Sequence, residues 1–186
     1  MSEPSTSLAA PEIGTAFIAQ SRELLSTDYL PKIEKCLQSI SDDDVWWRAN
    51  EESNSIGNLM LHLSGNVRQW ITSGLGGATD HRVRQAEFDE RSVISKAELL
   101  TRLSDSLREV DAVLAGFDST QLLKRYKIQD SDVTALEAVF HVVEHFSMHT
   151  GQIILLTKLL VKKDLGFYDF STGSPVHTWR EPGTQT

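Results

Sequence analysis

The stretch of residues 134–163 constrains the fold more than any other part of the sequence. Thr134 and Glu137 form a capping box, which starts a helix. Lysines at positions 158, 162 and 163 complement the dipole at the far end, and Gly166 is expected to close the helix. At about 1.5 Å per residue, such a helix is roughly 43 Å long, which exceeds the usual length in a globular protein. We therefore expect the rest of the chain to be organised around it.

Three histidines occur in this stretch at a spacing of four residues: His141, His145 and His149. In a helix they lie on one face, one turn apart, with neighbouring Cβ atoms about 6 Å from each other. Two imidazoles at that separation can share a zinc-like ion about 2.1 Å from each nitrogen. The intervening residues are mostly apolar, and a buried polar group without a partner costs about 1–3 kcal/mol. The partner is either a metal ion or a neighbouring side chain, and the spacing leaves both open.

The overall composition excludes several classes of protein. A length of 186 residues with 40% hydrophobic residues is typical of one domain with a real core. The net charge of −8 and pI near 5.2 argue against a nucleic-acid partner, which requires a basic patch. The single cysteine, Cys36, excludes an intrachain disulfide and leaves His, Asp and Glu as metal ligands. No signal peptide and no apolar run of about 20 residues is found, so we predict a cytoplasmic protein without a membrane partner.

Apolar residues at helical spacing predict three further helices. The first spans about 15–40, with a kink or brief break at 28–31 because of Pro31. The second spans about 56–73, begins at Ser55 or Asn54, and ends at Gly74. The third spans 96–115, with a capping box of Ser95 and Glu98. Four helices with few strand signals predict an all-α fold, a four-helix bundle.

The remaining segments flank or connect this bundle. We predict a flexible arm over 1–13, the bundle over 14–165, and an aromatic tail over 166–186 that packs on the bundle or on a partner chain. Trp46 and Trp47 are expected to cap one end of the core, and a short extended piece is expected at 125–128. The connection over 78–94 is long and charged. Its residues either pair with one another or contribute to a cavity mouth, and the sequence does not decide between these roles for Arg82, Arg84, Glu87 and Arg91.

The predicted second helix carries a polar stripe beside its apolar positions: Asn58, His62, Asn66 and Gln69. Such a stripe indicates a helix that lines a polar cavity, although Gln69 alone suits a plain solvent face. Bundles place cofactors between facing helices, which could bring His62 opposite the histidines of 134–163. Three imidazoles from two helices would leave open coordination positions for water or substrate.

Three runs of sequence together resemble the DinB-like, damage-inducible family of bacterial proteins: NSIGNLMLHLSGNVRQW, RVRQAEFDER and EAVFHVVEHFSMHTGQI. The resemblance covers most of residues 15–160. It implies a DinB-like four-helix bundle, usually a homodimer, with a divalent metal ion held by His62, His145 and His149. His141, Asn58, Asn66 and Gln152 are then candidates for the cavity or for positions behind the ligands. Three imidazoles suit zinc, nickel, iron or cobalt, of which zinc and nickel are the leading predictions.

The resemblance also suggests a function. The superfamily includes enzymes that use bacterial low-molecular-weight thiols, among them a mycothiol-dependent isomerase. We therefore predict a thiol (S-)transferase that binds a small-molecule substrate and an external thiol. The sulfur must come from outside because Cys36 lies on the first helix. One alternative is a metal-dependent hydrolase, weakened because Glu144 only flanks the site as a general base. Another is a non-catalytic metal-binding or small-molecule-binding protein of the stress response.

Overall fold

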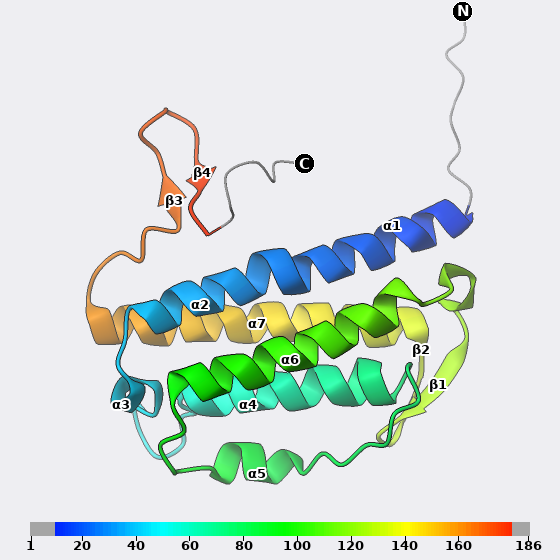
Figure 1. The fold of residues 1–186 in the computed structure, drawn as a ribbon, viewed down its shortest axis with the longest axis horizontal. Coiled ribbons are helices and arrows are strands. Elements are labelled where there is room, and N and C mark those ends of the chain that lie inside the picture. Colours follow the sequence, from blue (N-terminus) through cyan, green and yellow to red (C-terminus); the bar gives the residue numbers. More distant parts are fainter. Residues whose placement is uncertain (1–9, 180–186) are drawn as a thin grey trace, which may run out of the picture.

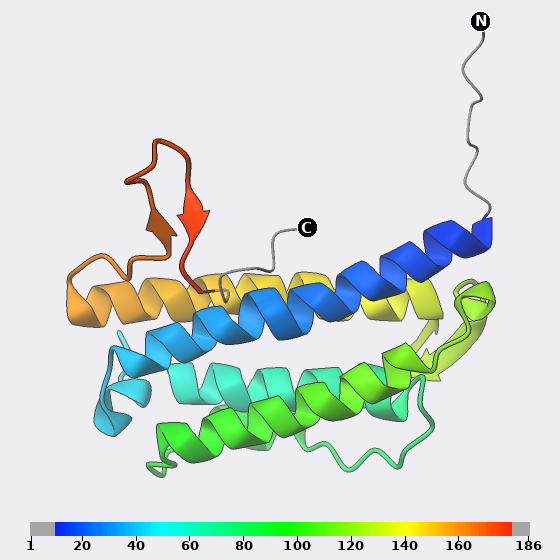
Figure 2. The same ribbon diagram turned by 45° about the horizontal axis from the view of Figure 1, so that its top comes forward.

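Four long helices lie side by side in the computed structural model, which describes residues 10–179 (Figure 1). The first helix comprises α1 (Ala10–Glu23), a π-helical turn η1 (Leu24–Tyr29) and α2 (Leu30–Gln38). The second comprises α4 (Ile56–Val67) and a π-helical turn η2 (Arg68–Ser73), the third is α6 (Lys96–Ala115), and the fourth is α7 (Ala135–Val161). The second helix packs against α6 and α7, and the first lies across α6 and α7 (Figure 2). The predicted all-α four-helix bundle is confirmed.

The first helix differs from its prediction in its middle and at its start. A kink or brief break was expected at 28–31, but the helix does not break there. Instead, Leu30 N–H donates to Leu25 O across a π turn. A proline inside a regular α-helix would clash with the carbonyl four residues earlier, and the wider turn makes room for Pro31 at the start of α2. The helix also begins earlier than the predicted arm allows. Residues 10–13 are helical, with Glu12 complementing the dipole in the first turn, while residues 1–9 lie outside the described part.

The other predicted helix boundaries agree closely with the structure. The predicted capping box at Thr134 is formed, and of the one predicted at Ser95 only the first half is formed, in which Ser95 Oγ accepts from Glu98 N. Ser55, one of the two expected starts of the second helix, forms a capping box with Asn58. The fourth helix ends slightly before the predicted closure, because Lys162 adopts a left-handed conformation with φ 53° and its N–H bonds to Lys158 O.

Short elements occupy the connections. The chain after η2 was expected to be a long loop, but it contains α5 (Arg84–Asp89), which lies along α4. This helix has no side-chain cap and no buried residue, so local sequence signals for it are weak. The predicted extended piece is β1 (Arg125–Ile128), which pairs antiparallel with β2 (Ser131–Thr134). The remaining short elements are α3 (Asp42–Val45), η3 (Ser119–Gln121), β3 (Tyr168–Asp169) and β4 (Val176–His177).

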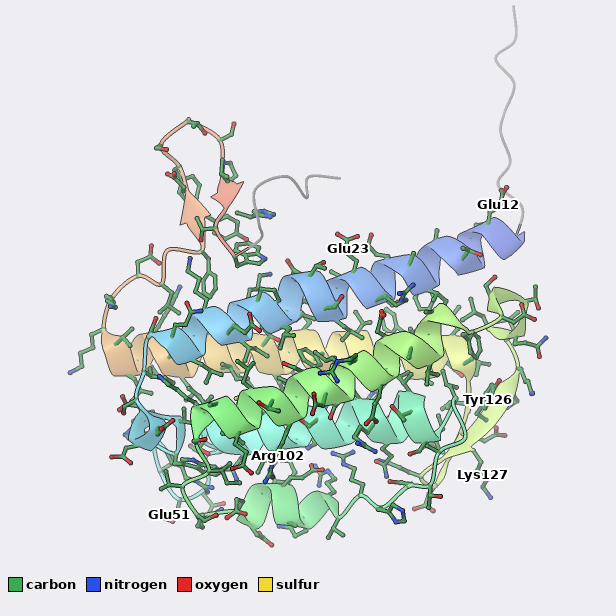
Figure 3. The ribbon with its side chains drawn as sticks, in the orientation of Figure 1. Glu12, Glu23, Glu51, Arg102, Tyr126 and Lys127 are labelled. Carbon is green, nitrogen blue, oxygen red and sulfur yellow. The ribbon has the colours of Figure 1, made fainter. Side chains whose placement is uncertain are left out.

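The core fills the space between the four helices and leaves charged side chains on the outside. Its largest fully buried members include Phe146, Ile33, Leu63 and Leu103. Labelled residues such as Glu12 and Glu23 point away from the bundle (Figure 3). Within residues 10–179, none of the helices combines the length and the apolar character that crossing a bilayer requires.

Two aromatic predictions have different outcomes. Trp46 packs over Gly57, where an added Cβ would lie 2.8 Å from its ring, and its indole N–H donates to Ile94 O. Trp47 is 39% exposed, so Trp46 alone closes this end of the core. In the described part of the tail, Trp179 donates its indole N–H to the buried carboxylate of Asp28 on the first helix.

Candidate metal centre

Three histidines from two helices converge in the middle of the bundle. His62 comes from α4, and His145 and His149 come from successive turns of α7. The Nε2 atom of His145 lies 3.1 Å from that of His62 and 3.2 Å from that of His149. His62 and His149 are buried, while His145 is partly exposed. The three could hold a metal ion, since one nitrogen of each lies within 4.8 Å of the others.

Hydrogen bonds behind the cluster determine which nitrogens face its centre. Nδ1 of His62 lies 2.9 Å from a carboxylate oxygen of Glu87, and Nδ1 of His149 lies 2.7 Å from the amide oxygen of Gln152. Both oxygens only accept hydrogen bonds, so both Nδ1 atoms donate. In a neutral imidazole the other nitrogen then carries a lone pair. The Nε2 lone pairs of His62 and His149 therefore both point at the same atom, Nε2 of His145.

This arrangement fits a cation better than it fits hydrogen bonding among the rings. A neutral His145 has one hydrogen on Nε2 at most, so it can satisfy only one of the two lone pairs that face it. With that hydrogen on Nδ1 instead, three lone pairs converge, which is the donor set of a three-histidine metal site. Nδ1 of His145 is itself buried and has no hydrogen-bond partner within the described residues.

The electrostatic surroundings favour the neutral, metal-binding form of His145 and His149. Burial, followed by the neighbouring His149 and His62, lowers the pKa of His145 to about 3. Burial also lowers the pKa of His149, although the hydrogen bond to Gln152 opposes that shift. Because a metal ion competes with protons for the same lone pairs, neutral imidazoles are ready to bind it at neutral pH.

Two residues that the sequence left undecided stand directly behind His62. Arg82 donates to both oxygens of Glu87, from Nε at 2.7 Å and from Nη2 at 2.9 Å. Burial raises the pKa of Glu87, but hydrogen bonds from Arg82 and His62 outweigh it and lower the pKa below its usual value. Phe88, the next residue, covers His62 with its ring centre 4.7 Å away. The signal that could have identified the pair is the run RVRQAEFDER, which contains both residues.

The other predicted residues either lie beside the three histidines or support one of them from behind. His141 is not part of the three-histidine group. Its Nε2 atom lies 3.3 Å from the amide nitrogen of Asn66, and its ring centre lies 4.2 Å from that of Trp70, with the two rings tilted by 39°. Burial lowers the pKa of His141 as well. Gln152 supports His149 from behind, as described above.

Asn58 bonds both to side chains and to the backbone. Its oxygen accepts hydrogen bonds from Ser55 and Arg48, and its amide donates to the carbonyls of Glu87 and Glu90. Its oxygen and its amide are thus both engaged. Asn58 joins the start of α4 to the segment that carries Glu87.

Gln69 and Cys36 complete the set of predicted positions. Gln69, for which a plain solvent face was favoured, accepts a hydrogen bond from Arg82 and donates one to Asp80. Cys36 is fully buried on α2, and burial raises the pKa of its thiol to about 11. It is not in the histidine group, so it supplies no sulfur to it.

Comparison with known proteins identifies the family to which this chain is similar. The model of the family described as "Protein of unknown function (DUF1572)" matches residues 12–173. The fold is similar to that of a conserved protein from Enterococcus faecalis, with a TM-score of 0.62 and 16% identity over 84% of this chain and 100% of the other. It is also similar to a DinB-like protein from Bacillus subtilis, with a TM-score of 0.60 and 18% identity over 81% and 98%. No curated protein matches the chain.

The family match spans most of the chain, and the two solved structures cover 84% and 81% of it with a similar fold. Identities below 25% carry the fold alone, so the histidine geometry stands on the structure itself. The three sequence runs that resemble DinB-like proteins lie within the matched residues. The chain therefore belongs to the family of proteins of unknown function DUF1572.

Proposed function

We propose that this protein is a divalent-metal-dependent enzyme that transfers a small external thiol to an electrophilic substrate. The observation that carries the proposal is the convergence of three Nε2 atoms, from His62, His145 and His149, with neighbours 3.1 and 3.2 Å apart. Three imidazoles on one side of a cation leave its other side available to a ligand. Zinc and nickel are the ions that we favour, and iron and cobalt suit the same donors.

The residues around the cluster would have different roles in such a reaction. When bound, the cation stabilises the thiolate form of a thiol placed at an open position. His145, the partly exposed member, lies where a ligand can approach. A cleft of about 210 Å³ beside Gln152, lined by Leu59, Leu155 and Leu156, can take the apolar part of a substrate. In the transfer, sulfur bonds to an electrophilic carbon, the leaving group departs, and the thiol proton passes to solvent.

Neither alternative gains a specific observation. A hydrolase needs a carboxylate that is able to take a proton from water. Glu87 contacts the cluster, but its oxygens are engaged by Arg82 and His62. Glu144 is exposed, next to His145 in sequence. A non-catalytic binding protein would use the same three histidines, so the test below must separate it from the enzyme.

The predicted partners and setting stay predictions. A homodimer is what the resemblance implies, and the aromatic tail was expected to pack on the bundle or on a partner chain. Tyr168 and Phe170, which are 46% and 65% exposed on the β3–β4 segment, favour the tail as the interface of a homodimer. The cytoplasmic location and the role in stress response rest on the sequence argument.

The test is a panel of thiols (cysteine, glutathione and coenzyme A) with the electrophile 1-chloro-2,4-dinitrobenzene, with and without added Zn²⁺ or Ni²⁺. We expect thiol consumption above the uncatalysed rate only when metal, thiol and electrophile are all present. His149→Ala should abolish that increment. His177→Ala, which removes a histidine from the distant tail, is the control and should leave it unchanged.

The outcomes separate the three classes of function. Equal rates in wild type and His149→Ala would reject metal-dependent thiol chemistry. Ester hydrolysis without thiol would indicate a hydrolase. Metal uptake with neither reaction across the panel would indicate a binding protein. Circular dichroism of His149→Ala checks that the variant is folded, so that a lost rate can be assigned to the site.

A further inference from the structure

We propose that Glu87, seated against Gly65 and held by Arg82, is the positioning residue that aims His62 at the cation. The inference rests on the metal binding proposed above but not on the thiol chemistry. It assigns a role to the segment between η2 and α6, which lies outside the four long helices.

The carboxylate of Glu87 determines which nitrogen of His62 is free. Its Oε2 atom lies 2.9 Å from Nδ1 of His62, on the ring side opposite the cluster. Arg82 Nη2 lies 3.0 Å from the same Nδ1 and donates one of its two hydrogens to Oε2 of Glu87. With a carboxylate as acceptor, Nδ1 keeps its hydrogen and Nε2 presents its lone pair inward. A carboxylate behind a metal-binding imidazole also fixes the ring orientation and increases its basicity.

Arg82 makes the buried carboxylate tolerable and limits its movement. The side chains of Arg82 and Glu87 are only 5% and 11% exposed. A buried charge is strongly destabilising unless it is paired and hydrogen-bonded. Arg82 satisfies both oxygens of Glu87 in a two-point contact, and its third group, Nη1, donates to Gln69 at 2.8 Å. The carboxylate is therefore fixed in plane and in distance.

Gly65 provides the space in which the pair sits. It follows His62 by three residues, which places it on the same face of α4, one turn on. A Cβ atom added at Gly65 would lie 2.0 Å from Oε1 of Glu87 and 2.8 Å from Nε of Arg82. Any side chain here must push the carboxylate away from its place behind His62. A glycine inside a helix normally reduces its stability, so this position is explained by the close approach.

The first experiment measures affinity for Zn²⁺ and Ni²⁺ by competition with a chromophoric chelator. Glu87→Gln keeps the shape of the side chain and removes its charge, and we expect affinity to fall by about 10- to 100-fold, as for other partners of metal-bound histidines. Asp89→Asn is the matched control. It removes the same charge from the same short helix, but Asp89 is exposed and, within residues 10–179, its side chain bonds to Gln85 alone, so the affinity of this variant should equal that of wild type.

The second variant, Gly65→Ala, removes no polar group and adds one methyl group. If Gly65 were merely a helix residue, alanine would stabilise α4 and leave metal binding alone. As a seat for Glu87, it should lose affinity by about tenfold. Because the added Cβ also presses on the Arg82–Glu87 pair, the thermal midpoint of the metal-free protein should not show the gain expected at an ordinary helix position. A rise in the thermal midpoint with unchanged affinity would instead identify Gly65 as an ordinary helix residue.

A third measurement needs no variant. Long-range ¹H–¹⁵N spectra of the metal-free protein should report the Nδ1-protonated form of His62, and the Nε2-protonated form would overturn the proposal. Unchanged affinity in both Glu87→Gln and Gly65→Ala would also overturn it, while leaving the proposed function standing if His149→Ala loses metal. A wild-type protein that binds neither ion would overturn both proposals.

Discussion

The two helices that contribute histidines support them in different ways. On α7, His149 is held by Gln152, three residues further along the same helix. On α4, His62 is held by Glu87, which is 25 residues away in the sequence and belongs to another element. The first support forms whenever α7 forms, because it follows from helical spacing. The second forms only when the segment carrying α5 docks on α4. One half of the site is therefore local, and the other half depends on tertiary structure.

The largest effect on the support from the second helix is expected at Asn58. This residue joins the start of α4 to the segment that carries Glu87. Asn58→Ala removes a capping box and takes a donor away from two partly buried carbonyls, those of Glu87 and Glu90. We expect the free energy of unfolding to fall by about 3 kcal/mol. Because the segment is released, metal affinity should fall as well, even though the support on α7, Gln152, is intact. Chemical denaturation and the chelator competition measure the two effects.

Asn54→Ala, just before the cap, is the control for this change and should lie within about 0.5 kcal/mol of wild type. Full stability in Asn58→Ala would mean that the connection to α5 does not depend on this side chain. Lower stability with unchanged metal affinity would mean that His62 keeps its orientation without the docked segment.

A smaller effect is expected when the local support is removed. Gln152 is exposed, and the hydrogen bond that it accepts from His149 is neutral, so Gln152→Ala should weaken Zn²⁺ binding by only about threefold. Titration of the variant against Gln38→Ala, an exposed glutamine on α2, measures the difference. A loss as large as that of Glu87→Gln would show that both helices support their histidines equally.

The smallest effect is expected at His141. Its Nε2 faces Asn66 and its ring lies on Trp70, so it is outside the group of three. His141→Ala should change Zn²⁺ affinity by less than about twofold, whereas His145→Ala should lose more than about a hundredfold. A large loss of affinity in His141→Ala in the same titration would indicate a site of four histidines, three of which come from α7.

The same contrast explains what could be predicted from the sequence. The start of α7 and the face shared by His145 and His149 follow from spacing and from a capping box, and both are found as expected. His62 was assigned through a resemblance, because facing positions on two helices are not encoded by spacing within either. The roles of Arg82 and Glu87 stayed undecided, because their hydrogen-bond partners Gln69 and His62 come from the second helix, η2 and α4. The short helix that carries Glu87 has no cap, so its docking is visible only in three dimensions.

The π turns were missed for a different reason. A π turn differs from an α turn by one residue, and apolar spacing over six residues does not resolve that difference. The prediction at Pro31 located an irregularity in the right place but gave it the wrong form. The wide turn keeps the helix continuous where a break was expected.

That wide turn between α1 and α2 holds one residue more than a regular α-helix would need. Deleting one residue of Leu24–Tyr29 should therefore return the segment to regular geometry without rotating the helix that follows. Ile33, Cys36 and Leu37 would keep facing the bundle. Pro31, however, would meet the carbonyl four residues earlier, for which the wider turn now makes room. A single-codon deletion here should therefore cost stability through the proline alone, and Pro31→Ala in the shortened chain should relieve most of that cost.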